Sequence, residues 1–161
     1  MQVDYANQDL QFPDREVYSI ENVDVSSVMN YSRQLDQSSW NMIVGEVKGL
    51  YGLSHNWDGD DSYKPAQPAI SFLLRLLHEL QKTGCFAPSY INVSGNGEVS
   101  ICWETDQIVV EFTVGYTDAR LTYIQMQLGR SWTRSLDGRN LHDLGTMSSV
   151  VQKITGLLDE A

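Results

Sequence analysis

Residues 98–114 read EVSICWETDQIVVEFTV, and apolar side chains recur at every second position of this stretch. A period of two is typical of antiparallel strands that bury one face and expose the other. With a tight turn at Thr105–Asp106, the apolar sets of the two strands coincide. The predicted facing pairs are Trp103 and Ile108, Ile101 and Val110, and Val99 and Phe112. The stretch therefore predicts a hairpin with one buried side.

The preceding segment, SYINVSGNGEVS (residues 89–100), predicts another hairpin, in which burial decides the length of the loop. Asn96-Gly97 is the usual signal for a two-residue turn, but that turn would put Val93 on the solvent face. A three-residue loop over 95–97 pairs Val93 with Val99 instead and keeps both on the buried face. We therefore expect the three-residue loop, with Gly97 at positive φ.

Beyond residue 114 the alternation continues in LTYIQMQLG (residues 121–129). This pattern predicts a fourth strand with Ile124, Met126 and Leu128 on the buried face. Residues 129–145 carry no clear period, and we expect them to be irregular.

Three helices are expected around these strands. In PAISFLLRLLHELQKTG (residues 68–84) the apolar stripe has a helical period, with Pro68 in the first turn and Gly84 as terminator. An earlier helix should begin at Asp36–Ser39, capped by Ser38 or Ser39, and stop near Gly52. A last helix should follow a cap at Thr146 or Ser148, and its apolar residues are Val150, Val151, Ile154, Leu157 and Leu158.

The fold class predicted from these elements is α+β. We expect a four-stranded antiparallel meander packed on one face by helices, in the order α-α-β-β-β-β-α. Residues 36–161 would form a single α+β domain. Residues 1–35 are polar and acidic and should form an extended N-terminal segment.

The chain is acidic, with a formal net charge of −10, and the excess is concentrated in residues 1–61, which hold 11 acidic and three basic side chains. Such a balance argues against direct binding to nucleic acid or to an anionic membrane. It permits docking on a basic surface of another protein, although the simpler interpretation is that acidity mainly keeps a cytosolic protein soluble. Two cysteines, Cys85 and Cys102, are too few for a disulfide framework, and no signal peptide is recognised, so we expect a cytoplasmic protein.

The stretch SHNWDGDDSYKPAQP (residues 54–68) gathers three aspartates. A calcium loop starting at Asn56 would need glycine at position 61 and glutamate at position 67, but these positions hold Asp61 and Gln67. Acid–base catalysis would need a desolvated carboxylate, whereas an aspartate on such a loop is expected to be hydrated. We therefore expect a structural loop, in which Trp57 anchors into the core and Asp58-Gly59 makes a turn.

The order of L-x-x-N-W-D-G, an apolar helix, an Asn-Gly turn and a strand ending in W-E resembles small, uncharacterised bacterial and phage proteins with an N-W-D-G motif. The resemblance covers roughly residues 53–114 and departs from the family pattern at Asp60-Asp61-Ser62-Tyr63. It implies a fold unit, a structural role for Trp57 and Asp58, and a bacterial or mobile-element setting. It assigns no catalytic residue.

Arginine is concentrated near the C-terminal end. Arg120, Arg130, Arg134 and Arg139 fall within a short segment, and Trp132 lies between two of them. Arginine and an exposed tryptophan anchor many protein interfaces. The alternative is that each arginine pairs with a nearby acid; the candidates are Asp118, Asp137 and Asp143.

No motif for catalysis, cofactor binding or metal binding is recognised in the sequence, so catalytic, cofactor and metal residues are left unassigned. We expect a non-enzymatic protein-binding module, such as a bacterial or phage inhibitor, antitoxin or anti-defence factor. The alternatives are a small hydrolase or transferase that uses the 58–61 loop, and a structural or oligomeric subunit. The expected binding residues are Arg130, Trp132, Arg134, Arg139, Asp60 and Asp61.

Overall fold

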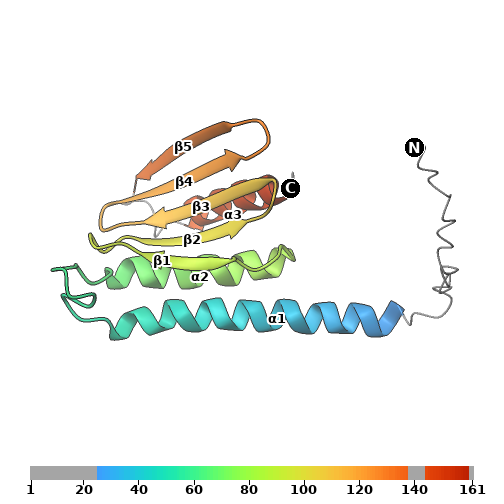
Figure 1. Ribbon diagram of the computed structural model, residues 1–161, viewed down its shortest axis with the longest axis horizontal. Helices are drawn as coiled ribbons and strands as arrows, with labels where there is room; N and C mark the ends of the chain where they lie inside the picture. Colours follow the sequence, from blue (N-terminus) through green and yellow to red (C-terminus); the bar gives the residue numbers. More distant parts are fainter. Residues whose placement is uncertain (1–24, 138–143, 160–161) are drawn as a thin grey trace, which may run out of the picture.

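The computed structural model describes residues 25–137 and 144–159. Its elements in chain order are α1 (Val25–Gly49), a 3-10 turn η1 (Leu50–Gly52), α2 (Gln67–Thr83), β1 (Tyr90–Val93), β2 (Val99–Glu104), β3 (Ile108–Val114), β4 (Asp118–Gln125), β5 (Arg130–Asp137) and α3 (Leu144–Leu158). The α+β class is confirmed. Figure 1 shows the strands side by side in one sheet, with the helices below and behind it.

The sheet has five antiparallel strands in the order β1-β2-β3-β4-β5, one more than the expected meander. The additional strand, β5, lies in the segment 129–145 that was expected to be irregular. Arg130 and Arg134 occupy helix-facing positions of β5, as their pairing with Gln125 and Leu121 requires. Because these charges interrupt the apolar alternation, the sequence gives no strand signal there.

The β1–β2 hairpin forms as expected. Val93 pairs with Val99, and Ser94 N donates to Glu98 O across 3.0 Å, so the loop is the three-residue 95–97 loop. Gly97 has φ +82°, as predicted.

The β2–β3 hairpin has a different register from the expected one. Trp103 pairs with Val110 rather than with Ile108, so the ladder is displaced by two residues. A shift of two residues leaves each side chain on its own face, and therefore burial does not choose between these registers. The hydroxyl of Thr105 accepts from the backbone N–H of Gln107 and Ile108, at 3.2 and 3.1 Å, and fixes the turn one residue later than expected.

The buried face of β4 is also different from the expected one. Leu121 and Tyr123 are buried, whereas Met126 and Leu128 are more than half exposed and lie beyond the strand. Two sets of alternating apolar residues overlap in this segment. Leu121 and Tyr123 would face one side of the strand, and Ile124, Met126 and Leu128 the other. Pairing with β3 decides between them, because Tyr123 lies opposite the buried Val110.

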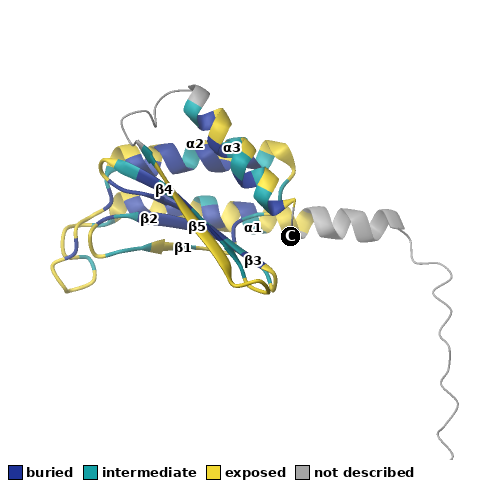
Figure 2. Ribbon diagram, turned by 90° about the horizontal axis from the view of Figure 1, so that it is seen from above, coloured by how far each residue is buried: buried dark blue, intermediate teal, exposed yellow. Residues whose placement is uncertain are grey.

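The helices cover one face of the sheet, and Figure 2 shows the buried residues gathered between α2, α3 and the strands. In α2 the predicted apolar stripe is buried except for the partly exposed Leu74, and Gly84 ends the helix at φ +79°. Helix α1 begins at Val25, so residues 25–35 are helical rather than extended, and Asp36–Ser39 lie inside the helix. Likewise α3 begins at Leu144, so Thr146 and Ser148 are not its caps.

One continuous core joins the helices to the inner face of the sheet. Its largest fully buried side chains are Trp40, Phe72, Trp103 and Phe112. The indole of Trp103 donates to Phe86 O across 3.1 Å, which satisfies its buried N–H. Within the described residues, no helix has the length and apolar character that crossing a membrane would need.

Candidate functional site

The loop over residues 53–66 folds on its own hydrogen bonds. Asn56 closes it from both sides, because its backbone N–H donates to Ser62 O across 2.7 Å and its Oδ1 accepts from Asp61 N across 2.8 Å. Asp58 Oδ1 accepts from Asp60 N across 2.9 Å, which confirms the expected turn. Asn56 and Asp61 have φ of 59° and 56°, a region that few residues other than glycine, asparagine and aspartate adopt.

The three aspartates of this loop are exposed. The nearby Ser62 hydroxyl and the hydrogen bond from the backbone N–H of Asp60 lower the pKa of Asp58. Such an environment favours the ionised carboxylate, whereas a general acid needs a raised pKa. Asp58 therefore fits the structural role better than the catalytic one.

Trp57 is half-buried, and the core described above is built without it. Its indole Nε1 is buried and has no hydrogen-bond partner among the described residues. The expectation that Trp57 anchors the loop into the core is therefore wrong. The loop is held instead by its backbone.

Two turns of the sheet hold the end of the loop. Tyr63 N donates to Gly95 O across 2.8 Å, and the Tyr116 hydroxyl donates to Lys64 O across 2.5 Å. A Cβ on Gly97 would stand 3.0 Å from Lys64 O, so only glycine leaves room for this approach. The loop, the β1–β2 turn and the β3–β4 turn thus meet at one end of the sheet (Figure 1).

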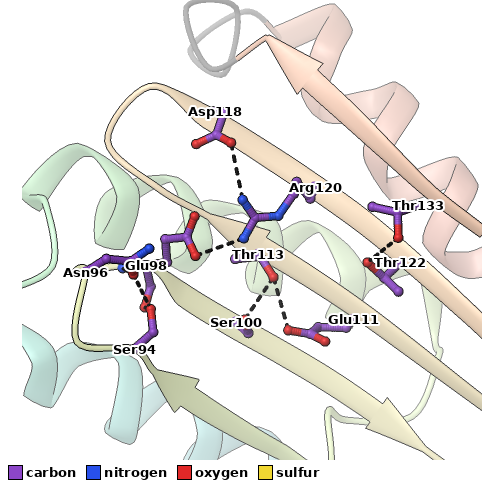
Figure 3. Close-up of polar contacts among 10 residues, drawn as sticks. All are labelled: Ser94, Asn96, Glu98, Ser100, Glu111, Thr113, Asp118, Arg120, Thr122 and Thr133. Atoms are coloured by element: carbon purple, nitrogen blue, oxygen red, sulfur yellow. Dashed lines mark hydrogen bonds and ion pairs between the residues drawn. The ribbon is translucent and has the colours of Figure 1, made fainter.

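An ion-pair cluster braces the same two turns from the sheet. Arg120 donates to Glu98, at the base of the β1–β2 turn, across 2.8 Å and to Asp118, after the β3–β4 turn, across 3.4 Å. Figure 3 shows the Arg120 guanidinium between these two carboxylates. The Arg120 hydrogen bond lowers the pKa of Glu98, and the same contact raises the pKa of Arg120.

Where the three loops meet they line a hollow of ≈510 Å³, formed by His55, Tyr63, Lys64, Asn96 and Tyr116. We call these five residues, together with Asp60 and Asp61 of the same loop, the three-loop surface. Tyr63 and Tyr116 are 55% and 57% exposed, although both are held at the backbone or hydroxyl. The His55 and Tyr63 rings meet edge to face, 5.1 Å apart. The surface therefore presents exposed aromatic rings beside exposed carboxylates.

A different surface lies at the far edge of the sheet, between β5 and α3. A hollow of ≈450 Å³ is lined by Trp132 and Arg134 of β5 and by Gln152, Lys153, Gly156 and Leu157 of α3. We call it the β5–α3 groove. Trp132 stacks on Tyr123 with ring centroids 5.7 Å apart and remains 41% exposed.

The expected binding residues fall on these separate surfaces. Trp132 and Arg134 line the groove, with Arg130 on the same face of β5, while Asp60 and Asp61 lie on the loop that docks at the β1–β2 turn. Arg130 starts β5, and β5 begins at the end of the sheet that holds the β2–β3 turn, away from that loop (Figure 1). Arg139 lies outside the described residues. The structure thus separates the arginine segment from the acidic loop.

Of the four arginines, Arg120 pairs with acids as the alternative interpretation expected. Within the described residues, Arg130 and Arg134 take part in no ion pair. Sequence reasoning did not assign Tyr63, Lys64 and Tyr116 to a site. The sequence carries only a weak indication of the two tyrosines as site residues. Tyr63 directly follows Asp61-Ser62, and Tyr116 directly follows Gly115 of the β3–β4 turn.

No group of three histidine, cysteine or acidic side chains is arranged to hold a metal ion in residues 25–137 and 144–159. Comparison with protein-family models, with curated proteins and with solved structures finds no match for this chain. The resemblance to N-W-D-G proteins stays a prediction.

Proposed function

We propose that this protein is a non-enzymatic protein-binding module whose three-loop surface docks on a basic surface of another protein. The observation that supports it most is the convergence of three turns that hold exposed tyrosines beside carboxylates. Tyr63 and Tyr116 each bring a large contact area at a low cost in side-chain entropy. Asp60 and Asp61 supply charge for a basic partner.

The frame beneath this surface is suited to binding because it is ordered before a partner arrives. Hydrogen bonds at Tyr63 and Lys64 tie the loop to the sheet, and Arg120 braces both turns. A preordered surface spends less free energy on ordering when it binds. The net charge of −10 would also speed encounter with a basic partner at low salt.

Within this class, we favour an inhibitor, antitoxin or anti-defence factor of bacterial or phage origin, working in the cytoplasm on a protein rather than on nucleic acid. This part rests on the resemblance to N-W-D-G proteins and on the acidic balance. The hydrolase or transferase alternative is supported less well, because the pKa of Asp58 is lowered rather than raised.

The test is a comparison of three forms of the full chain as bait in the native host. The loop variant carries Asp60→Asn, Asp61→Asn and Tyr63→Ala. Asparagine is chosen at position 61 because it tolerates the positive φ found there. The control variant carries Asp36→Asn and Glu46→Gln, which remove the same charge from exposed positions of α1.

We expect one stoichiometric partner that the wild type and the control retain and the loop variant loses. With the purified partner, the loop variant should bind about ten-fold more weakly, which is about 1.4 kcal/mol. Wild-type affinity should fall as salt rises. Equal binding by all three forms would contradict the proposal.

A further inference from the structure

Strand β5 leaves one edge of the sheet open. It pairs with β4 on one side, and no described strand pairs with its other side. The edge is eight residues long and contains no proline, and its charged residues, Arg130, Arg134 and Asp137, disfavour pairing with a strand of like charge. Figure 2 shows β5 exposed along much of its length. Its outward N–H and C=O groups can therefore receive another strand.

An apolar hollow lies directly beside this edge. Trp132 forms one wall and Leu157 of α3 the other. A Cβ at Gly156 would meet nothing within 4 Å, so the helix leaves space above its backbone. A strand added at β5 would direct alternate side chains toward this hollow, since residues alternate between the two faces of a sheet.

The charge around the hollow is positive, although the chain carries −10 overall. Arg134 and Lys153 line the hollow, and Arg130 lies on the same face of β5. The ion pairs found in the described residues use Lys82 and Arg120, so these three cations are not neutralised there. The edge therefore matches a segment that carries carboxylates.

We propose that β5 and α3 receive an extended acidic segment of a partner protein. The segment adds to the sheet as a sixth strand, places an apolar side chain against Trp132, and sets carboxylates beside Arg134 and Lys153. A second copy of this chain fits less well, because β5 paired with β5 would gather Arg130 and Arg134 of both copies along one seam. This surface is separate from the three-loop surface, so the inference goes beyond the proposed function.

The probe is a short synthetic peptide, blocked at both ends, in which threonine alternates with glutamate and leucine in turn. Glutamate and leucine then share the face that meets α3. The control peptide has lysine in place of each glutamate. Binding to the full chain is measured by titration calorimetry, and exchange of the β5 amide protons is followed by NMR.

We expect the acidic peptide to bind about ten-fold more tightly than the basic one. It should also slow exchange at alternate β5 amides, because every second N–H points to the open edge. The variant Arg134→Glu/Lys153→Glu should reverse the preference between the peptides. The matched variant Arg75→Glu/Lys82→Glu, with reversed charges on α2, should keep the wild-type preference.

Equal affinity for the two peptides, or unchanged exchange of the β5 amides, would overturn the proposal. So would protection, in the free protein, of the alternate β5 amides that point to the open edge and not to β4. In a monomer, that protection would place another segment of this chain on the edge, and in a dimer it would place a second copy there. Light scattering on the same sample separates these two outcomes.

Discussion

Gly97 lies so close to Lys64 that a Cβ on the glycine would stand 3.0 Å from the lysine carbonyl oxygen. The two residues belong to different turns, one on the 53–66 loop and one between β1 and β2. Their contact, together with the hydrogen bond between Tyr63 N and Gly95 O, makes the two turns a single unit. Substitutions at this junction should therefore affect the three-loop surface as well as stability.

Replacement of Gly97 by alanine should destabilise the fold by about 2 kcal/mol, because the side chain is strained at φ +82° and meets backbone atoms. The midpoint of urea unfolding measures this change, provided the slope is unaltered. Gly45→Ala is the matched control, since Gly45 is in α1 with nothing within 4 Å of its Cβ position. It should gain about 0.5–1 kcal/mol. Equal stability of the two variants would show that the junction is loose.

Replacement of Tyr116 by phenylalanine should loosen the loop, because it deletes the hydrogen bond to Lys64 O. We expect a global loss of about 0.5–1 kcal/mol and faster hydrogen exchange at the Tyr63 amide. Tyr51→Phe removes a comparable exposed bond, to Ser71 Oγ at 2.8 Å, far from this loop. If both variants changed the Tyr63 amide equally, the Tyr116 contact would not be specific.

The brace at Arg120 should make stability depend on pH. Because Arg120 lowers the pKa of Glu98 below its ordinary 4.5, the pair stabilises the fold above that pH. This contribution is lost as the pH falls through the lowered pKa. Arg120→Gln should therefore cost about 1 kcal/mol or less at pH 7, since the pair is partly exposed, and still less at low pH.

Denaturant unfolding of the wild type and the Arg120→Gln protein at a series of pH values measures this difference. The same substitution in a Glu98→Gln/Asp118→Asn background is the control, because Arg120 then contacts no carboxylate among the described residues and the cost should be nearly independent of pH. If the difference in unfolding free energy between the wild type and Arg120→Gln grew as the pH fell below 4.5, the assigned role of Glu98 would be contradicted.

A buried hydroxyl pair on the outer face of the sheet offers a separate test. Figure 3 shows Thr113 in contact with both Ser100, across 2.9 Å, and Glu111, across 3.1 Å. Because the single hydroxyl proton of Thr113 is donated to Glu111, Ser100 is the donor in the other hydrogen bond. Thr113→Val leaves the Ser100 hydroxyl without this acceptor and should cost about 1–2 kcal/mol. Adding Ser100→Ala should recover part of that cost, because the stranded hydroxyl is removed. A double-mutant cycle with no coupling energy would mean that the pair does not interact.

The sequence predicts most of the fold where one physical signal dominates. Burial alone sets the β1–β2 register, since a slip of one residue would expose Val93. Burial does not set the β2–β3 register, because a slip of two residues leaves every side chain on the same face. The hydrogen bonds of the Thr105 hydroxyl determine that register instead. Apolar alternation also does not predict strand β5, because Arg130 and Arg134 occupy positions on its helix-facing side where apolar residues are expected.

The candidate site is predicted only in part, for a different reason. Asp60 and Asp61 could be singled out as a local charge cluster. Tyr63 contacts Gly95, and Tyr116 contacts Lys64. These are tertiary contacts between turns, and no periodic pattern in the sequence predicts them. The helix start at Val25 was missed because the early part of α1 is mostly polar, and the apolar spacing of Val25, Val28 and Met29 is interrupted at Ser32 and Arg33.

Site-specific photo-crosslinking in the native host tests the central claim most directly, with benzoylphenylalanine placed singly at exposed aromatic positions. Tyr63 and Tyr116 sample the three-loop surface, and Phe86 and Tyr90, which are 41% and 44% exposed, sample other parts of the surface. We predict that one partner is cross-linked from Tyr63 and from Tyr116 and not from Phe86 or Tyr90. Crosslinks of equal yield from all four positions, or none from the two tyrosines of the three-loop surface, would contradict the claim that this surface binds a protein.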